Sequence, residues 1–296
     1  MKRKVIRVTL TLKDGKEVFV SGKNKLTSEE LAVSCNFAYG NGAVTPTAQI
    51  TIFGLPLEKM MKLMRLQWNT MDSLLNMVRI EAGNEGEDLQ LVYDGNITQA
   101  TIDMNQAPTP PLIITSQMAV YEKAKVMPPY TSPKGVSINI ADLVSQLCAE
   151  IEYTFENNGV DNVGVDITLE GSNIEKIQKL ANIFDFDLYV EQKSVTICKL
   201  GEPRLTKIPV ISPSSGLIGY PVPDVKGVNF SCLYDPLVKF GGIVRIENSV
   251  LGDLVNRDWR IYGYTAQLEA YVQNGKWQID AQATWRDSKD IAMGRK

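Results

Sequence analysis

The segment Val78-Arg79-Ile80-Glu81 recurs as Val244-Arg245-Ile246-Glu247, 166 residues later, and this recurrence decides how the chain is divided. Each copy alternates apolar and charged side chains, which is typical of a strand with one buried face. A polar hairpin tip follows each copy. If a supersecondary unit is duplicated, further matches should flank both copies in the same order and at a similar distance.

Such matches are present on both sides of the motif. Residues 93–100 correspond to 261–268, 112–118 correspond to 277–283, and 48–55 correspond to 228–233. The series predicts the same arrangement of strands twice, with an extra segment around residues 57–70 in the first copy only. The alternative is a single large β-rich domain interrupted by an α+β insertion.

The sequence between the copies has helical rather than strand periodicity. Asn139 is a candidate N-cap for one helix, and Gly171-Ser172-Asn173 opens a second helix. We therefore expect an α+β, mainly β protein in which two related β-barrel domains flank a small α+β domain. The expected boundaries are 1–120 for the first β-barrel, 121–134 for a linker, 135–202 for the small α+β domain, 203–286 for the second β-barrel with a proline-rich lead-in at 209–223, and 287–296 for a polar tail.

The alternation of side chains also predicts local elements. A hairpin is expected at residues 6–20, with its turn at 13–16, and strands are expected at 73–82, 89–93 and 96–104. A second short hairpin is expected around the turn Gln192-Lys193 in the α+β domain.

Composition excludes several classes of function. The chain has 31 basic and 34 acidic residues, a net charge of −3, which argues against a protein built to grip duplex DNA. It has no histidine, so a Ser-His-Asp centre, a His-ligated zinc site and a histidine proton shuttle are impossible within it. The four cysteines form no C-x-x-C pair, and we expect them to be buried free thiols.

We expect no targeting signal in the N-terminal residues. The start Met1-Lys2-Arg3-Lys4 is basic, but residues 5–12 alternate instead of forming an apolar core. No segment approaches the ~18 continuous apolar residues of a membrane span. We expect a soluble product that is made in the cytoplasm and is not secreted.

Three motifs could carry chemistry, and each has a simpler interpretation. The tip Glu85-Gly86-Glu87-Asp88 lacks the ligand spacing of a calcium loop. Asp185 and Asp187 could serve glycan hydrolysis, but no partner glutamate is identifiable, so a structural role is expected. Gly40-Asn41-Gly42 and Gly241-Gly242 lack the helix and lysine of a P-loop and are read as turns. No catalytic, cofactor-binding or metal-ligating residue is therefore assigned, and no enzymatic activity is expected.

Other side chains suggest contact surfaces. The methionines between residues 60 and 77 either form an adaptable surface or pack against the chain's own barrel. Trp259, Trp277 and Trp285 are expected to be core or interface anchors. The candidate subunit-interface residues are Met60, Met61, Met64, Trp68, Arg79 and Arg245.

Two stretches resemble a known family. Residues 48–56 (Ala-Gln-Ile-Thr-Ile-Phe-Gly-Leu-Pro) are similar to an early A-x-I-x-I-x-x-L strand, and residues 171–181 are similar to a strand-to-helix junction, in the baseplate hub proteins of contractile-tailed bacteriophages. The order of barrel, small α+β domain and second barrel is also similar. The resemblance implies two tube-protein-like barrels in each chain.

The resemblance also implies a function. Three hub chains with two barrels each would form a ring that adapts a sixfold tail tube to a threefold central spike and lines the DNA channel. The implied partners are two further copies of the chain, the tail tube protein, the central spike protein and other baseplate proteins in the virion, with DNA only as passing cargo. The alternatives are a glycan-binding or glycan-degrading β-rich protein, or another tail-tube or distal-tail component of a phage-like injection machine.

Overall fold

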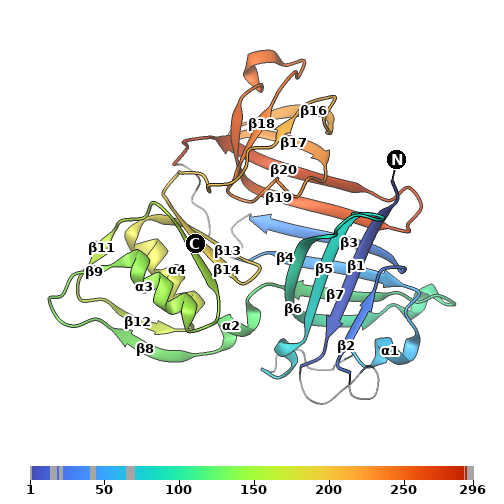
Figure 1. Cartoon of the computed structure of the whole chain (residues 1–296), viewed down its shortest axis with the longest axis horizontal. Coiled ribbons are helices and arrows are strands. Elements are labelled where there is room, and N and C mark those ends of the chain that lie inside the picture. The colour runs from blue at the N-terminus through green and yellow to red at the C-terminus, as the bar shows by residue number, and fades with distance from the viewer. Residues whose placement is uncertain are drawn as a thin grey trace. The chain divides into compact units, whose positions relative to one another are not determined.

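The structure is a computed structural model that describes residues 2–13, 19, 23–40, 45–64, 71–289 and 291 (Figure 1). Strands make up 48% of the chain and helices 15%, so the predicted mainly β, α+β class is confirmed. The strands are β1 (Lys4–Thr11), β2 (Lys25–Ser28), β3 (Ala32–Gly40), β4 (Thr47–Phe53), β5 (Met77–Asn84), β6 (Gln90–Ile102), β7 (Leu112–Gln117), β8 (Met127–Thr131), β9 (Ile138–Asn139), β10 (Thr154–Asn158), β11 (Val163–Gly164), β12 (Thr168–Gly171), β13 (Phe186–Glu191), β14 (Ser194–Lys199), β15 (Val210–Ile211), β16 (Leu217–Asp224), β17 (Gly227–Leu233), β18 (Ile243–Ile246), β19 (Asp258–Ala270) and β20 (Trp277–Trp285). The helices are α1 (Leu57–Met61), α2 (Val120–Ala124), α3 (Ile140–Ala149) and α4 (Asn173–Phe184), and the 3₁₀ turns are η1 (Ser73–Leu75), η2 (Met104–Gln106) and η3 (Gly252–Leu254).

Two compact units divide the chain. The first contains residues 1–38, 47–121 and 265–278, and the second contains residues 39–46, 122–264 and 279–296. The long strands β19 and β20 contribute to both units. Residues 265–270 of β19 and 277–278 of β20 belong to the first unit, and their other residues belong to the second.

The first unit is built on a sheet whose strands run in the order β3-β4-β7-β6-β5-β1-β2. Its strands bury alternate side chains; Val78, Ile80 and Ala82 of β5 face the core, and Arg79 and Glu81 lie on the other face. This alternation is the physical basis of the repeated sequence motif, because successive side chains of a strand point to opposite faces.

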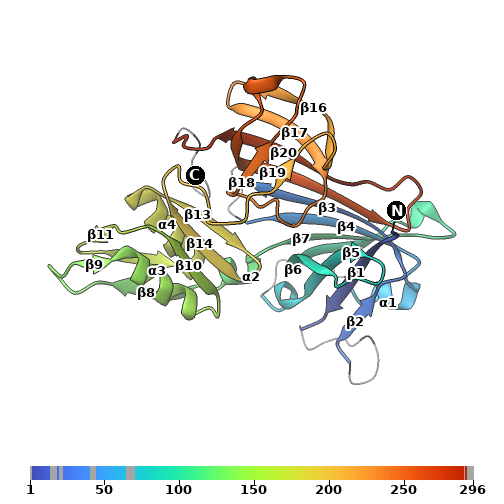
Figure 2. The same ribbon diagram turned by 45° about the horizontal axis from the view of Figure 1, so that its top comes forward.

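The second unit contains a sheet with the order β16-β17-β20-β19-β18-β15. Figure 2 shows β16, β17 and β20 of this sheet one beside the other. Reading the two orders against each other pairs β3 with β16, β4 with β17, β7 with β20, β6 with β19, β5 with β18 and β1 with β15. The matched segments of the sequence fall on four of these pairs, and β6 and β19 each have 13 residues. The same strand order therefore occurs twice.

The two copies differ in one pairing, and neither is closed in the part of the chain that the structure describes. β1 is antiparallel to β5, whereas β15 is parallel to β18. In the residues that the structure describes, the strand path is open, ending at β2 in the first unit and at β16 in the second. The closed barrels expected from the sequence are thus not seen in this part of the chain.

The segment between the two copies folds as helices on small sheets. The side chain of Asn139 accepts the backbone N–H groups of Ala141 and Asp142, which confirms it as the N-cap of α3. Ser172 and Glu175 form a capping box at the start of α4. β13 and β14 form the expected hairpin, and its two turn residues, Gln192 and Lys193, both have positive φ.

The prediction of two strands at 89–93 and 96–104 was wrong. A single strand, β6, runs through Asp94-Gly95, which has the composition of a turn. Gly95 is needed there for another reason: a Cβ at this position would lie 2.5–2.8 Å from the ring of Tyr93. The strand expected at 73–82 also differs, because its first three residues form the 3₁₀ turn η1.

Two stretches expected to connect domains contain secondary structure. Residues 121–134 include most of α2 and all of β8, which pairs with β12. The lead-in 209–223 contains β15 and most of β16, whose prolines fit an edge strand because Pro cannot donate to a ladder. The turn of the N-terminal hairpin and the loop after Gly40 lie largely outside the described residues.

Candidate subunit-contact surfaces

An apolar surface lies on and beside the short helix α1. Leu57 and Met61 are four residues apart, so they share one helix face, and they are 45% and 61% exposed. Met60 points the other way and is buried. Met64 follows at the end of this turn, and Met104 of η2 is also exposed. We call Leu57, Met61, Met64 and Met104 the α1 surface.

A cavity of about 350 Å³ opens beside this surface. One side is formed by the end of β4 and the start of α1, and the other by the connection between β6 and β7. None of its lining residues is charged, so it suits an apolar side chain rather than an ion. The lining residues are Gly54, Leu55, Leu57, Met60, Met104, Ala107, Pro108, Thr109 and Pro110.

The methionines predicted as contact residues therefore separate into two groups. Met61 and Met64 are exposed, whereas Met60 belongs to the core of the first unit. Trp68 lies outside the described residues. Leu57 and Met104 were missed, although the i, i+4 spacing of Leu57 and Met61 was a usable signal.

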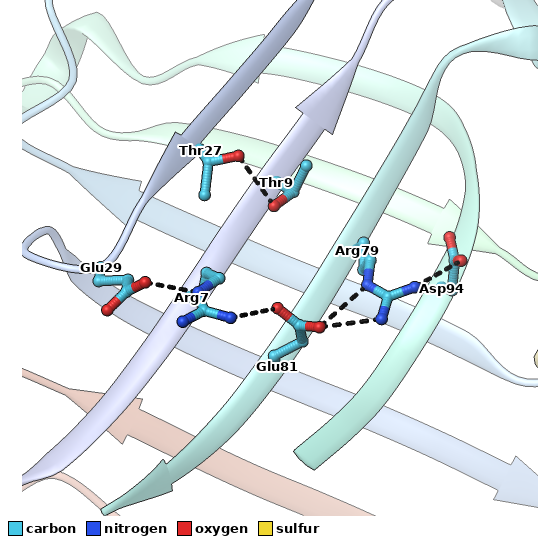
Figure 3. A network of polar contacts seen from close by, with 7 residues as sticks. All are labelled: Arg7, Thr9, Thr27, Glu29, Arg79, Glu81 and Asp94. Carbon is cyan, nitrogen blue, oxygen red and sulfur yellow. Dashed lines mark hydrogen bonds and ion pairs between the residues drawn. The ribbon is translucent and has the colours of Figure 1, made fainter. Parts of the chain in front are cut away.

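Arg79 belongs to a ladder of alternating charges on the outer face of the first sheet (Figure 3). Arg7 of β1 bonds both Glu29 and Glu81, with 3.0 Å between its Nη1 and Glu81 Oε2. Arg79 Nη2 lies 2.9 Å from Glu81 Oε1, and its Nη1 lies 3.9 Å from Asp94. Three carboxylates thus face two guanidinium groups, and both arginines form ion pairs within the ladder.

The central carboxylate of this ladder, Glu81, is held ionised. Its partial burial favours a higher pKa, but the hydrogen bonds from Arg79 and Arg7 outweigh that effect, so the pKa of Glu81 is lowered. The neighbouring Arg7 has a raised pKa, chiefly because of its bond to Glu29.

Arg245 occupies the equivalent place in the second sheet. It faces Asp258 on β19, as Arg79 faces Asp94 on β6. Its Nε and Nη2 lie 2.6 and 3.1 Å from the two oxygens of Asp258, which is bidentate geometry. The hydrogen bond from Arg245 lowers the pKa of Asp258. Both arginines are partly exposed, and both are paired.

A second exposed apolar strip lies on β16. Ile218, Tyr220 and Val222 are exposed. Ile218 and Val222 pair with Ser231 and Asn229, which are two residues apart on β17, so both lie on one face of the sheet. Tyr220 lies in the irregular stretch between them, after Gly219 with a φ of +68°. In the sequence, Pro221 and Pro223 favoured a lead-in over a strand for this stretch. We call these three residues the β16 edge.

The carboxylates considered for chemistry have structural roles here. Asp187 is fully buried, forms an ion pair with Arg260 and accepts the backbone N–H of Gly201. Asp185 ends α4 in the left-handed conformation. At the tip between β5 and β6, the carboxylate of Glu87 accepts hydrogen bonds from Lys2 and Asn84. No group of metal-ligating side chains occurs among the described residues.

The cysteines are buried as expected, and the tryptophans differ in their burial. All four cysteines are buried and free, and burial raises the pKa of Cys148, Cys198 and Cys232 to about 12. Trp259 is a core residue, whereas its neighbour Trp285 is half exposed. No helix within the described ranges is both long enough and apolar enough to traverse a bilayer.

Comparison with protein families gives one match along most of the chain. Residues 5–277 match the model of a family described as baseplate hub gp41. A search of curated proteins gave no match.

Several solved structures share the fold at low sequence identity. A tail protein from Neisseria meningitidis has a TM-score of 0.61 at 9% identity, covering 96% of this chain and 97% of its own. The 43 kDa tail protein of prophage MuSo2 from Shewanella oneidensis has a TM-score of 0.59 at 7% identity, covering 96% and 99%. The c3393 protein of E. coli has a TM-score of 0.57 at 8% identity, covering 86% and 73%; it is described as a type VI secretion component with similarity to the T4 tail proteins gp27 and gp5.

Proposed function

The chain belongs to the baseplate hub gp41 family, and from this premise we propose that it is the trimeric hub of a phage tail baseplate, joining a sixfold tail tube to a threefold central spike. Its place would be the virion baseplate, after synthesis in the host cytoplasm. Its partners would be two further copies of itself, the tube protein, the spike protein and other baseplate proteins.

The repeated strand order carries this proposal. The path β3-β4-β7-β6-β5-β1 recurs as β16-β17-β20-β19-β18-β15, so each chain supplies two similar modules. We assign them to residues 1–120 and 203–286, with the small domain 135–202 between them. Three chains then present six similar modules toward the tube while keeping true threefold symmetry toward the spike.

The charge arrangement supports a channel that passes DNA as cargo. Phosphate binding depends on available Lys and Arg side chains. Arg79 and Arg245, at equivalent places in the two modules, are both engaged by carboxylates. The proposed role is structural rather than enzymatic. Of the two carboxylates considered for hydrolysis, Asp187 is committed to an ion pair and Asp185 ends α4.

Mass in solution, combined with particle averaging by electron microscopy, tests the proposal. We expect a mass of three times 32.9 kDa at high concentration and six lobes around an open centre. A single-chain mass at every concentration, both alone and with the spike protein of the same phage, would contradict it. So would a particle with one continuous lobe per chain.

A further inference from the structure

Within the first unit, the far half of β19 covers the outer edge of β3. Residues 265–270 of β19 belong to this unit, and β19 is the neighbour of β3 in the sheet. The side chain of Ser34 on β3 donates to Glu269, with 2.8 Å between Oγ and Oε1. Residues 265–270 of β19 therefore protect the outer edge of β3 within the first unit (Figures 1 and 2).

The hairpin of β19 and β20 also covers the start of β1. The guanidinium of Arg3 lies 4.2 Å from the ring centre of Tyr271, and the ammonium of Lys4 lies 5.3 Å from that of Trp277. Next to them, Val5 and Ile6 are buried.

The equivalent positions of the second copy are exposed. β16 corresponds to β3 but ends its strand path, and the β16 edge is open, with Tyr220 70% exposed. β15 corresponds to β1, and the apolar residues leading into it, Leu205 and Ile208, are exposed, as is Val210. Apolar strips of this kind on an edge strand mark contact sites.

The first copy offers a hairpin equivalent to the one that covers β3. It is formed by β6 and β7, and residues 99–102 of β6 pair with β7 on one side, since Thr98 lies at a register shift. Among the described residues, no strand pairs with the other side of residues 99–102. The α1 surface and its cavity lie at this end of the hairpin, where Met104 and Pro108 follow β6.

We propose that the β16 edge and the start of β15 dock onto the β6–β7 hairpin and the α1 surface of a second copy of the chain. This inference rests on the proposed function and names the residues of its subunit contact. It reproduces between chains the junction that β19 makes with β3 inside one chain. Since the two surfaces differ, the contact is head-to-tail, and such contacts form a ring when the rotation between copies closes.

Charge substitutions test the two surfaces separately. Tyr220→Asp on β16 and Met61→Asp on α1 each place a carboxylate in an apolar contact, so we expect each to raise the dissociation constant of the trimer by about tenfold or more. Val163→Asp and Ile183→Asp, on similarly exposed apolar residues of the α+β segment, are the matched controls and should leave the mass unchanged. Circular dichroism of each variant checks that it is folded.

Cysteine cross-linking tests the direction of the contact. Two variant chains, Tyr220→Cys and Met104→Cys, are mixed and oxidised mildly; the native cysteines are buried and do not compete. We expect covalent pairs only when both variants are present. Efficient linkage of the Tyr220→Cys chain to itself would indicate a symmetric contact and overturn the inference.

The remaining outcomes distinguish this contact from the ring itself. A trimer that neither Tyr220→Asp nor Met61→Asp weakens, and that gives no mixed cross-link, overturns the contact and leaves the hub proposal standing. A wild-type chain that stays single at every concentration, with and without the spike protein, overturns both.

Discussion

Arg260 and Asp187 form an ion pair with 3.0 Å between Nη1 and Oδ2, and both side chains are completely buried. Asp187 lies on β13 beside the helices, and Arg260 lies on β19 of the second sheet, so the pair connects the inserted segment to that sheet within one compact unit. Arg260 also donates to the carbonyl oxygens of Ser288 and Ile291. The side chain of Arg260 therefore connects β19 to β13 and to the C-terminal residues Ser288 and Ile291.

Removing one partner of this pair should be costly. Asp187→Asn leaves the charge of Arg260 buried without compensation, and we expect a loss of about 3–5 kcal/mol in the free energy of unfolding. Urea denaturation measures it. Asp161→Asn, which breaks the exposed pair with Lys199, is the control and should cost less than about 1 kcal/mol. Equal effects would show that the buried pair has no special role.

The charge ladder of the first sheet predicts a loss of stability in acid. The folded-state pKa of Glu81 lies below its ordinary value of 4.5, so its stabilising effect is complete above that value. The effect is lost as pH falls through the lowered pKa, because protonation weakens the bonds to Arg7 and Arg79. Thermal unfolding followed between neutral and acidic pH should show a shallower dependence in Glu81→Gln than in the wild type. The exposed variant Glu152→Gln should keep the wild-type dependence.

Gly241 should tolerate no side chain. It has a φ of +77°, and a Cβ there would overlap the ring of Tyr189, which is buried in the core of the second unit. Gly86 has a φ of +78° with nothing within 4 Å of such a Cβ. Both Gly→Ala variants carry the same backbone strain, so the additional loss in Gly241→Ala measures the steric clash. Thermal unfolding compares them, and equal melting temperatures would mean that Tyr189 moves aside freely.

The duplication was accessible from the sequence because strand periodicity is local. Val78-Arg79-Ile80-Glu81 and its copy alternate core and surface positions, and both fall on equivalent strands of the two sheets. The helix caps at Asn139 and Ser172 were accessible for the same reason, since a cap depends on a few consecutive residues.

Features that depend on distant residues were not accessible. Asp94-Gly95 has the composition of a turn, but both residues pair with β5, which keeps the chain extended there. Likewise, the exposure of Tyr220 and the burial of Met60 depend on which strands lie beside them. Local pattern gives the period of a strand or helix, whereas tertiary pairing decides where it ends and which face is covered.

Releasing Arg79 should raise the affinity of the chain for DNA. Glu81→Gln together with Asp94→Asn removes both carboxylates that engage Arg79, and changes the net charge from −3 to −1. We expect the double variant to bind a short DNA duplex at low salt, with an affinity that falls as salt rises, because each neutralised phosphate releases counterions. Fluorescence anisotropy measures the affinity and its dependence on salt.

The control double variant, Glu152→Gln with Glu202→Gln, makes the same change in net charge away from the ladder and should not bind. Strong binding by the wild type would contradict a channel that passes DNA as cargo, and equal binding by the two double variants would show that net charge, rather than the freed guanidinium, is responsible.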